Sequence, residues 1–504
     1  MSHISRNIAL VSAASLFVGT TLSQTAPKPS VKPAAAAQAQ PWKSIPIPAL
    51  HDFKPQQPKR VELANGLVIY LQEDHELPFI DGSINIRGGS REVPAGKVGL
   101  ISLYSDAWRT SGSTSKPGDV LDQELAQKAA GIETGGDSDS TSLQWSSFKQ
   151  DFDQVFGEAV DLLLHPAFKQ DKLQLAQRGE MTAISRRNDS PDGIAAREAR
   201  KLVYGAGSPY ARQAEYSTVL SVTVDDLKSW HDRTVIPNGI IVAVVGDFDS
   251  AAMEAKLRAV FEPLQRGTLI ESPKVDFPGP TPGVYFADKE DINQSTVEIL
   301  GLGTQVNNPD YYALSVMNNI FSGGFGSRVF QYVRTKLGLA YDVGGRFGSS
   351  YDHPGIFLSE VGTKSVSTVP ATQAVLDVIA KLKTQPPTPD ELRKAKDEVM
   401  NSFIFRIDTP EKTLNEQVQL AFYGYPSDFL ERYHAGVEKV TAEDVTRVAN
   451  KYIDVSKLAI LVVGNKSEIQ PPLSGLGKVT DLDLTIPPPP GRAGAKPQAT
   501  APAQ

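Results

Sequence analysis

The chain has 504 residues, of which 40% are hydrophobic and 22% are charged, so it is long enough to bury two sizeable cores. Its 51 basic and 58 acidic residues give a net charge of −7, which argues weakly against a nucleic-acid-binding surface, and no basic run with interleaved aromatic residues occurs. The absence of cysteine excludes a disulfide framework and a lipidated cysteine anchor.

The first residues are typical of a targeting segment. Arg6 precedes an apolar run over residues 8–22, and a stretch rich in proline and alanine follows. We expect residues 1–23 to form a secretory signal peptide and residues 24–57 a linker. The apolar run is short for a transmembrane helix of about 20 residues, although an uncleaved anchor is the alternative. The prediction is an exported protein, periplasmic or secreted, with no transmembrane domain after signal cleavage.

The first half of the chain, residues 58–264, begins with strand patterns and continues with helical ones. Turn-flanked, β-branched or alternating residues predict strands over 66–71 and 80–86. Apolar residues at three- and four-residue spacing predict helices, and the half closes on an apolar strand over 240–245. The predicted helices cover residues 119–130, 152–164, 172–187 and 224–233.

The second half, residues 283–476, repeats this order after a junction at 265–282 that contains four prolines and is predicted to be an interdomain linker. Strand patterns lie within 284–300. Helical patterns follow over residues 311–321, 369–382, 388–406 and 442–452. Residues 477–504 include a run of four prolines, and we expect them to form a disordered tail that packs no core.

The two halves are copies of one domain. The segment from Val222 to Gly246 returns from Val440 to Gly464, with the same offset of 218 residues at both ends. This period is far too long for a solenoid repeat of about 20 to 50 residues. The predicted fold class is therefore α+β, with two homologous α/β sandwich domains, each a strand layer backed by helices.

Several motifs occur in a recognisable order. The first half contains Asn65-Gly66-Leu67, the run Arg-Gly-Gly-Ser-Arg-Glu at 87–92 and Gly99-Leu100. The second half contains Gly-Gly-Phe-Gly-Ser-Arg-Val at 323–329 and Arg-Thr-Lys-Leu-Gly-Leu-Ala-Tyr at 334–341. Together they resemble the pitrilysin or insulinase family of zinc peptidases, which includes the mitochondrial processing peptidases. The resemblance covers nearly all of residues 58–476 and implies half of a clamshell-shaped peptidase.

The resemblance also locates a metal position, which is altered in this chain. Active family members carry His-x-x-Glu-His on the helix that starts at the Gly99 equivalent, where two histidines share one helical face and the glutamate activates a zinc-bound water. Here those positions hold Ser102, Ser105 and Asp106. The chain's seven histidines, at 3, 51, 75, 165, 231, 353 and 434, include no pair at i, i+3 or i, i+4 spacing. We therefore expect this chain to bind no zinc.

A third metal ligand of the family, a glutamate on a later helix, would fall near Thr182 or Ala183, with Glu180 close by. Residues 137–142 lie where family members place an edge strand that accepts an extended peptide, although Gly135, Gly136 and Asp139 weaken that strand prediction.

Arg334 and Tyr341 match a pair that, in active members, holds the substrate backbone and stabilises the tetrahedral intermediate. A guanidinium and a phenol are suitable donors to an oxyanion, an effect of about 3 to 4 kcal/mol per donor in comparable sites. The alternative is that Arg334 pairs with a surface carboxylate and Tyr341 fills a core position.

These residues imply a chain that works with another. The leading hypothesis is the non-zinc subunit of an exported heterodimeric metallopeptidase, inactive alone, which supplies Arg334 and Tyr341 to a partner that holds zinc in an intact His-x-x-Glu-His site. Peptides would be the substrates. The alternative is a noncatalytic peptide-binding or scaffold homologue, which forms a homodimer or a complex with an unrelated partner.

Overall fold

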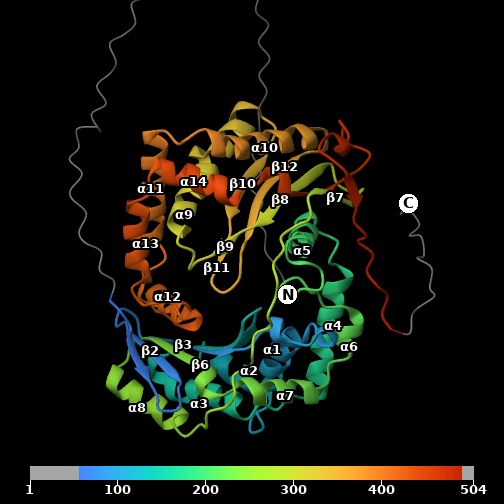
Figure 1. The fold of residues 1–504 in the computed structure, drawn as a ribbon. Helices are drawn as coiled ribbons and strands as arrows, with labels where there is room; N and C mark the ends of the chain where they lie inside the picture. The colour runs from blue at the N-terminus through green and yellow to red at the C-terminus, as the bar shows by residue number, and fades with distance from the viewer. Residues whose placement is uncertain (1–55, 491–504) are drawn as a thin grey trace, which may run out of the picture. The chain divides into compact units, whose positions relative to one another are not determined.

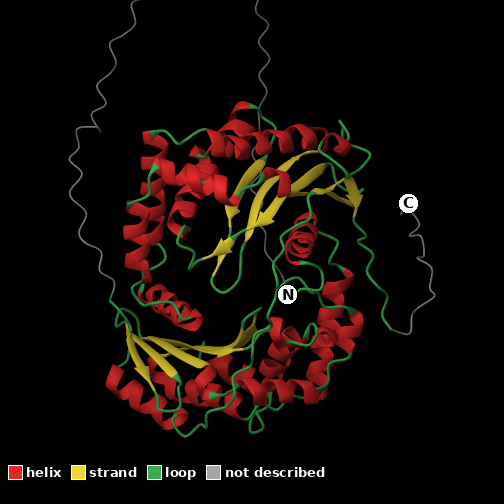
Figure 2. Cartoon of the chain, viewed as in Figure 1, coloured by secondary structure: helices red, strands yellow, loops and turns green. Residues whose placement is uncertain are grey.

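The structure, a computed structural model, describes residues 56–490. The predicted signal peptide and nearly all of the predicted linker at 24–57 lie outside these residues. Two mixed sheets, each backed by helices, make up the described part of the chain (Figures 1 and 2). Within it, no helix is both long enough and apolar enough to cross a lipid bilayer. The α+β fold class predicted from the sequence is confirmed.

The first sheet has the strand order β1-β2-β6-β3-β5-β4, with β4 at one edge. One face is covered by helices from the same half, whose apolar side chains form a single core with the strands. The strands are β1 (Lys59–Glu62), β2 (Val68–Glu73), β3 (Phe79–Arg87), β4 (Gly131–Gly136), β5 (Ser140–Phe148) and β6 (Ile240–Gly246). The helices of this half are α1 (Leu100–Ser111), α2 (Gly118–Gln127), α3 (Phe152–Leu164), α4 (Gln170–Ser185), α5 (Pro191–Tyr204), α6 (Tyr216–Leu220), α7 (Val224–Thr234) and α8 (Ser250–Phe261).

The second sheet has the order β10-β12-β8-β13-β7-β14, and helices of the second half cover one face in the same way. Its strands are β7 (Gly283–Asp288), β8 (Gln294–Leu302), β10 (Asp342–Phe347), β12 (Ile356–Lys364), β13 (Ala459–Gly464) and β14 (Val479–Asp481), beside a small pair of β9 (Thr304–Gln305) and β11 (Ser349–Ser350). The helices are α9 (Tyr311–Ser322), the π-helical η7 (Phe330–Lys336), α10 (Thr368–Thr384), α11 (Pro389–Ile404), α12 (Pro410–Tyr423), α13 (Phe429–Glu438) and α14 (Ala442–Tyr452).

The sequence repeat at 222–246 and 440–464 has a direct structural cause. Thr223 and Thr441 each begin a helix with a capping box, in which the threonine hydroxyl accepts from the backbone N–H of an aspartate three residues on. That aspartate, Asp226 or Asp444, accepts from the threonine N–H in return. Each helix then leads to a strand whose residues are all buried, β6 or β13. The repeat therefore encodes one helix-to-strand unit twice.

The two halves exchange a helix. The apolar side of α5, from the first half, packs on the second sheet, where Ala195 and Ala199 join a core with Leu300 and Leu461. In return α12, from the second half, packs on the first sheet through Leu414, Val418 and Phe422. The exchange is visible in Figure 1, where α5 lies beside β8 and α12 lies beside β2 and β3. Each sheet is therefore covered on both faces, which explains why β6 and β13 are uniformly apolar.

The predicted strands are present as β2, β3, β6, β7 and β8, and the predicted helices as α2, α3, α4, α7, α9, α10, α11 and α14, with shifts of a few residues at their ends. Residues 265–282 contain no helix or strand. The disordered tail predicted from residue 477 is wrong at its start. β14 pairs in parallel with β7, and Leu482 and Leu484 pack against the core that α5 shares with the second sheet. Apolar residues at alternate positions supply this packing despite the prolines that follow.

Candidate functional site

The helix that corresponds to the family's metal helix is α1. Its outward position Ser102 donates from its hydroxyl to Oε2 of Glu180 on α4, over 3.0 Å. Of the positions considered for the third ligand, it is Glu180 whose side chain contacts α1. Thr182 instead donates to the backbone carbonyl of Arg178 in its own helix.

The other two altered positions differ from each other in their surroundings. Ser105 is buried, and a Cβ atom added to Gly136 would lie 3.0 Å from its hydroxyl oxygen. Asp106 is exposed, yet the protein around it removes enough water to raise the pKa of its carboxyl group. Two serine hydroxyls and two carboxylates do not supply the nitrogen ligands of a catalytic zinc site. Over residues 56–490, no cluster of three or more His, Cys, Asp or Glu side chains that could hold a metal is found.

An open strand edge lies beside the altered metal position. β4 is the last strand of the first sheet and pairs only with β5 within that sheet. It packs on α1, and a Cβ atom on Gly136 would lie 2.3 Å from Ile101 Cγ2, so glycine is required for this close approach. Residues 137–139, expected to begin the edge strand, form the turn between β4 and β5 instead. The two glycines lowered the strand propensity that would have revealed β4.

Arg334 and Tyr341 lie together at the edge of the second sheet. Arg334 is on η7, Tyr341 immediately precedes β10, and the guanidinium carbon lies 5.9 Å from the centre of the tyrosine ring. Tyr341 is 78% exposed and Arg334 is exposed, so neither side chain fills a core position. Arg334 forms no salt bridge with any residue of the described chain, and it contacts the ring of Phe330 instead. Both polar groups therefore face solvent and are free to donate.

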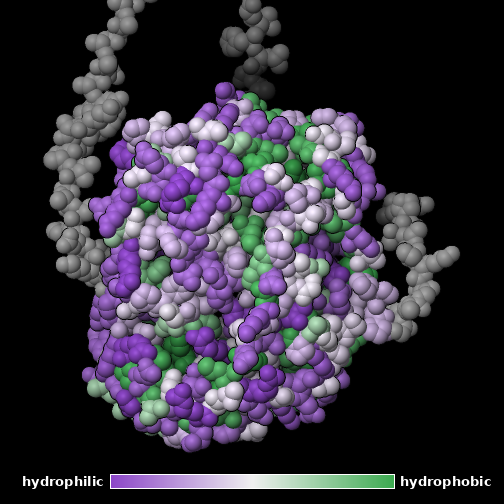
Figure 3. All heavy atoms as spheres, viewed as in Figure 1, coloured by the Kyte–Doolittle hydropathy of each residue, from purple (hydrophilic) through white to green (hydrophobic). Residues whose placement is uncertain are grey.

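Nearby apolar groups are also exposed. Phe325, in the glycine-rich turn before η7, is 76% exposed and stacks edge-on against Phe330. The face shown in Figure 3 is mainly hydrophilic, with hydrophobic patches among the polar residues. Within residues 56–490, no hydrogen bond or ion pair joins Arg334 or Tyr341 to the Ser102 and Glu180 position. The candidate catalytic groups of the two halves thus remain separate in this chain.

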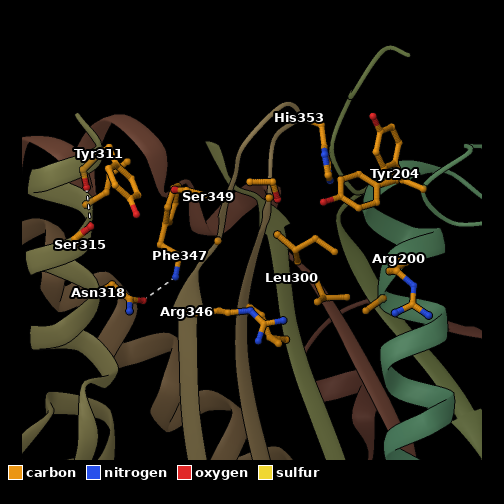
Figure 4. Close-up of a pocket in the computed structure, with 18 of the residues that line it drawn as sticks. Arg200, Tyr204, Leu300, Tyr311, Ser315, Asn318, Arg346, Phe347, Ser349 and His353 are labelled. Atoms are coloured by element: carbon orange, nitrogen blue, oxygen red, sulfur yellow. Dashed lines mark hydrogen bonds between the residues drawn. The ribbon is translucent and has the colours of Figure 1, made fainter. Parts of the chain in front are cut away.

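A cavity that the sequence did not predict lies between α5 and the second sheet (Figure 4). Its volume is about 870 Å³, and Glu298 of β8, Arg346 of β10 and Arg200 of α5 are among the residues that line it. The only signal in the sequence was a single acidic residue inside the apolar strand pattern Val297-Glu298-Ile299-Leu300.

Comparison with known families agrees with this geometry. Residues 221–399 match the family model described as the peptidase M16 inactive domain. These residues therefore carry a peptidase M16 inactive domain, a domain of the pitrilysin family. A protein of Helicobacter pylori named non-peptidase homolog YmxG is 24% identical over 419 residues, which cover 81% of this chain and 94% of that protein. A Bacillus subtilis protein named probable inactive metalloprotease YmfF is 26% identical over 48% of this chain and 57% of its own length. The resemblance found in the sequence is confirmed.

Solved structures share the fold of this chain. A peptidase M16 inactive domain from Pseudomonas fluorescens superposes with a TM-score of 0.73 at 24% identity and covers 82% of this chain and all of that chain. A protease from Helicobacter pylori gives 0.71 at 19% identity, over 81% of this chain and all of its own. The periplasmic protease PqqL from Escherichia coli gives 0.68 at 15% identity, and this chain matches 48% of its length.

Proposed function

We propose that this M16 homologue is the non-zinc subunit of an exported, two-chain metallopeptidase that cleaves peptides. The observation that carries the proposal is the contrast between the halves. The first half has serine hydroxyls at the metal positions, whereas the second half keeps Arg334 and Tyr341 exposed, adjacent and without competing carboxylates. In this role they would donate to the substrate backbone, while the partner would supply zinc and its activated water.

Several features of the chain support this division of labour. Arg334 and Tyr341 lie together on the surface without a structural ion pair in the described chain. Both side chains are suitable donors to a developing oxyanion, which would explain why they are adjacent. The exposed ring of Phe325, which packs on the half-buried Phe330, gives the same surface an apolar component. The open edge of β4 offers backbone groups to an extended peptide. An export signal at residues 1–23 belongs to the same proposal.

The test is purification of the tagged mature chain from its native host, followed by identification of the bound protein. We expect a stoichiometric partner with an intact His-x-x-Glu-His motif, about one zinc per pair, and chelator-sensitive peptide cleavage that neither chain shows alone. In the reassembled pair, Arg334→Ala should lower kcat/KM at least tenfold, because loss of one oxyanion donor costs about 10²-fold to 10³-fold in comparable sites.

The matched control is Arg393→Ala, an exposed arginine on α11 whose surface ion pairs are with Asp390 and Asp397. It should leave kcat/KM within twofold, since exposed ion pairs contribute about 0 to 1 kcal/mol. A zinc-free complex, or an active pair in which Arg334→Ala loses less than tenfold, would contradict the proposed role.

A second candidate function is peptide binding without proteolysis. The relative named non-peptidase homolog YmxG covers most of this chain and favours it. It predicts a homodimer or an unrelated partner, and an assembly that is indifferent to Arg334→Ala and Tyr341→Phe. The same purification separates the two candidates by the identity of the partner.

A further inference from the structure

Aromatic rings, not polar partners, hold the side chain of Arg334 in the part of the chain that the structure describes. Its guanidinium carbon lies 5.0 Å from the centre of the Phe330 ring and 5.9 Å from that of the Tyr341 ring. Within residues 56–490 the guanidinium donates no hydrogen bond and forms no ion pair, and the side chain is exposed. A long exposed side chain otherwise samples many rotamers, so these ring contacts are what restricts it.

Two other arginines of the described chain lie over aromatic rings, and each also has a polar partner. Arg87 lies over the ring of Phe422 and donates a hydrogen bond to the backbone carbonyl of the same residue. Arg406 lies over the ring of Phe403 and donates to both carboxylate oxygens of Glu416. In both cases a structural contact occupies donors of the guanidinium. The arginine of the candidate site differs, because its N–H donors all stay unoccupied.

Contact with a ring restrains an arginine and still leaves it able to donate. The guanidinium is attracted to the face of the ring, whereas its N–H groups point outward in its own plane. A carboxylate neighbour would instead occupy some of those donors and offset the positive charge. A group that must meet a developing oxyanion acts best when it is oriented before the reaction and its donors are not yet used.

Phe330 provides a fixed surface for this contact. It is half-buried against the core of the second half, and Phe325 packs edge-on against it with the ring centres 5.0 Å apart. Gln331 donates to the backbone carbonyl of Phe325 and so ties the glycine-rich turn to η7. Tyr341, by contrast, is largely exposed. Of the two rings beside Arg334, that of Phe330 is therefore the one held by the core.

The helix that carries Phe330 also carries Arg334. The two residues are four positions apart on η7, a spacing that brings side chains together on one side of a helix. Val333, between them, is fully buried in the second core and fixes η7 against it. The helix is π-helical, a rare form that often occurs at functional sites. Ring and guanidinium are thus placed by one short, anchored element.

We propose that Phe330 is a positioning residue, which orients the guanidinium of Arg334 and leaves its N–H groups free to donate. This role rests on the proposed function, in which Arg334 donates to the substrate backbone. Phe330 itself touches neither the reacting atoms nor zinc and acts only through Arg334. A single exposed contact of this kind contributes about a twofold to fivefold factor, and misorientation of a reacting group adds to the loss.

The first measurement uses the purified chain alone. Isotope-labelled arginine gives an NMR signal for each Nε–H group, and loss of a signal in Arg334→Ala identifies the one from Arg334. We expect its order parameter to be above about 0.6 in wild type and below that value, in the range of flexible groups, in Phe330→Leu. Phe330→Tyr keeps the ring and should keep the wild-type value. The matched control is Phe403→Leu, which removes a half-buried ring beside Arg406 from the same core and should leave the Arg334 signal unchanged.

The second measurement uses the reassembled pair of chains. Phe330→Leu should lower kcat for peptide cleavage about threefold to tenfold and change KM less than twofold, because an oriented donor acts in the transition state. In an Arg334→Ala background the same substitution should change kcat less than twofold, since the group that it positions is gone. A residue that only stabilises the fold would lower kcat by one factor in both backgrounds. Phe330→Tyr should keep kcat within twofold of wild type.

The two measurements distinguish failure of the positioning role from failure of the proposed function. An Arg334 order parameter that Phe330→Leu does not change would overturn the positioning role, and so would an equal loss of kcat in both backgrounds. A lower order parameter in Phe330→Leu, with no zinc-dependent cleavage by any reassembled pair, would refute the proposed function while the positioning of Arg334 by Phe330 stands. Thermal unfolding of each variant, measured in parallel, shows whether the fold is retained.

Discussion

Replacing Glu298 with glutamine should stabilise the protein at neutral pH and not at acidic pH. Burial and the neighbouring Glu360 raise the pKa of Glu298 from 4.5 to about 7. Between these values the folded chain holds a proton that the unfolded chain has released, so raising the pH destabilises the fold. The shift corresponds to about 3 kcal/mol at 1.36 kcal/mol per pKa unit. Glutamine keeps the shape of the side chain and has no charge to bury.

The assay is urea unfolding of wild type and Glu298→Gln, followed by circular dichroism at pH 5, 6, 7 and 8. All other titrating groups are shared by the two proteins, so the difference in unfolding free energy isolates Glu298. That difference should grow by about 3 kcal/mol in favour of the variant from pH 4.5 to above pH 7, and then level off. Glu76→Gln, which replaces an exposed glutamate, should stay within about 0.5 kcal/mol of wild type throughout. A difference that does not change with pH would refute the reasoning.

Three further substitutions test the packing of the two halves. Arg91 is 8% exposed and contacts Asp352 of the other half, so Arg91→Met should lower the unfolding free energy at pH 7 by about 3 to 5 kcal/mol. The control Arg186→Met, on the surface, should lower it by less than about 0.5 kcal/mol. Urea titration measures both unfolding free energies. Phe422→Ala removes a ring that α12 packs on the first sheet, so it should lower the unfolding free energy by about 3 to 5 kcal/mol. Fluorescence of the first-half tryptophans and circular dichroism should still report one shared unfolding transition. Two separated transitions would show that the exchanged helices do not couple the halves. Gly136→Ala places a methyl group against α1 and should lower the thermal midpoint, at a cost of about 1 to 3 kcal/mol, while an unchanged midpoint would show that β4 can move away from the helix.

The acid sensitivity of the contact between the halves follows from the same residues. Although burial opposes it, hydrogen bonds from His353 and Arg91 lower the pKa of Asp352 to about 2. This carboxylate therefore contributes stability above its unfolded pKa of about 3.8, which is lost as the pH falls toward 2. Tyr423 donates to Asp139 over 2.5 Å in the same region, so the contact joins α12 to the turn between β4 and β5.

Sequence periodicity predicted those elements whose apolar pattern is satisfied locally. α3 was predicted with its observed ends, because its buried side chains all face the sheet of its own half. Sequence periodicity did not predict α5 and α12 as helices, and it did not predict that each of them covers the sheet of the other half. Their apolar faces look alike in the sequence whichever sheet they cover, and the choice of sheet depends on contacts between residues about 100 to 350 positions apart.

Prediction of the candidate sites from the sequence was limited in the same way. The positions of Ser102, Arg334 and Tyr341 came from motifs, and the structure adds that Glu180 is the group that faces Ser102. Glu298 could not be found in this way, because its neighbours Arg346, Glu360 and Arg200 come from three other elements and meet only through strand register and helix exchange. By strand register and helix alignment, the equivalent positions of the first half hold Ser83, Gly135, Gln144 and Gln419. The architecture therefore does not require a carboxylate at the position of Glu298, and its raised pKa is a stability cost at neutral pH that only the second half carries at this position.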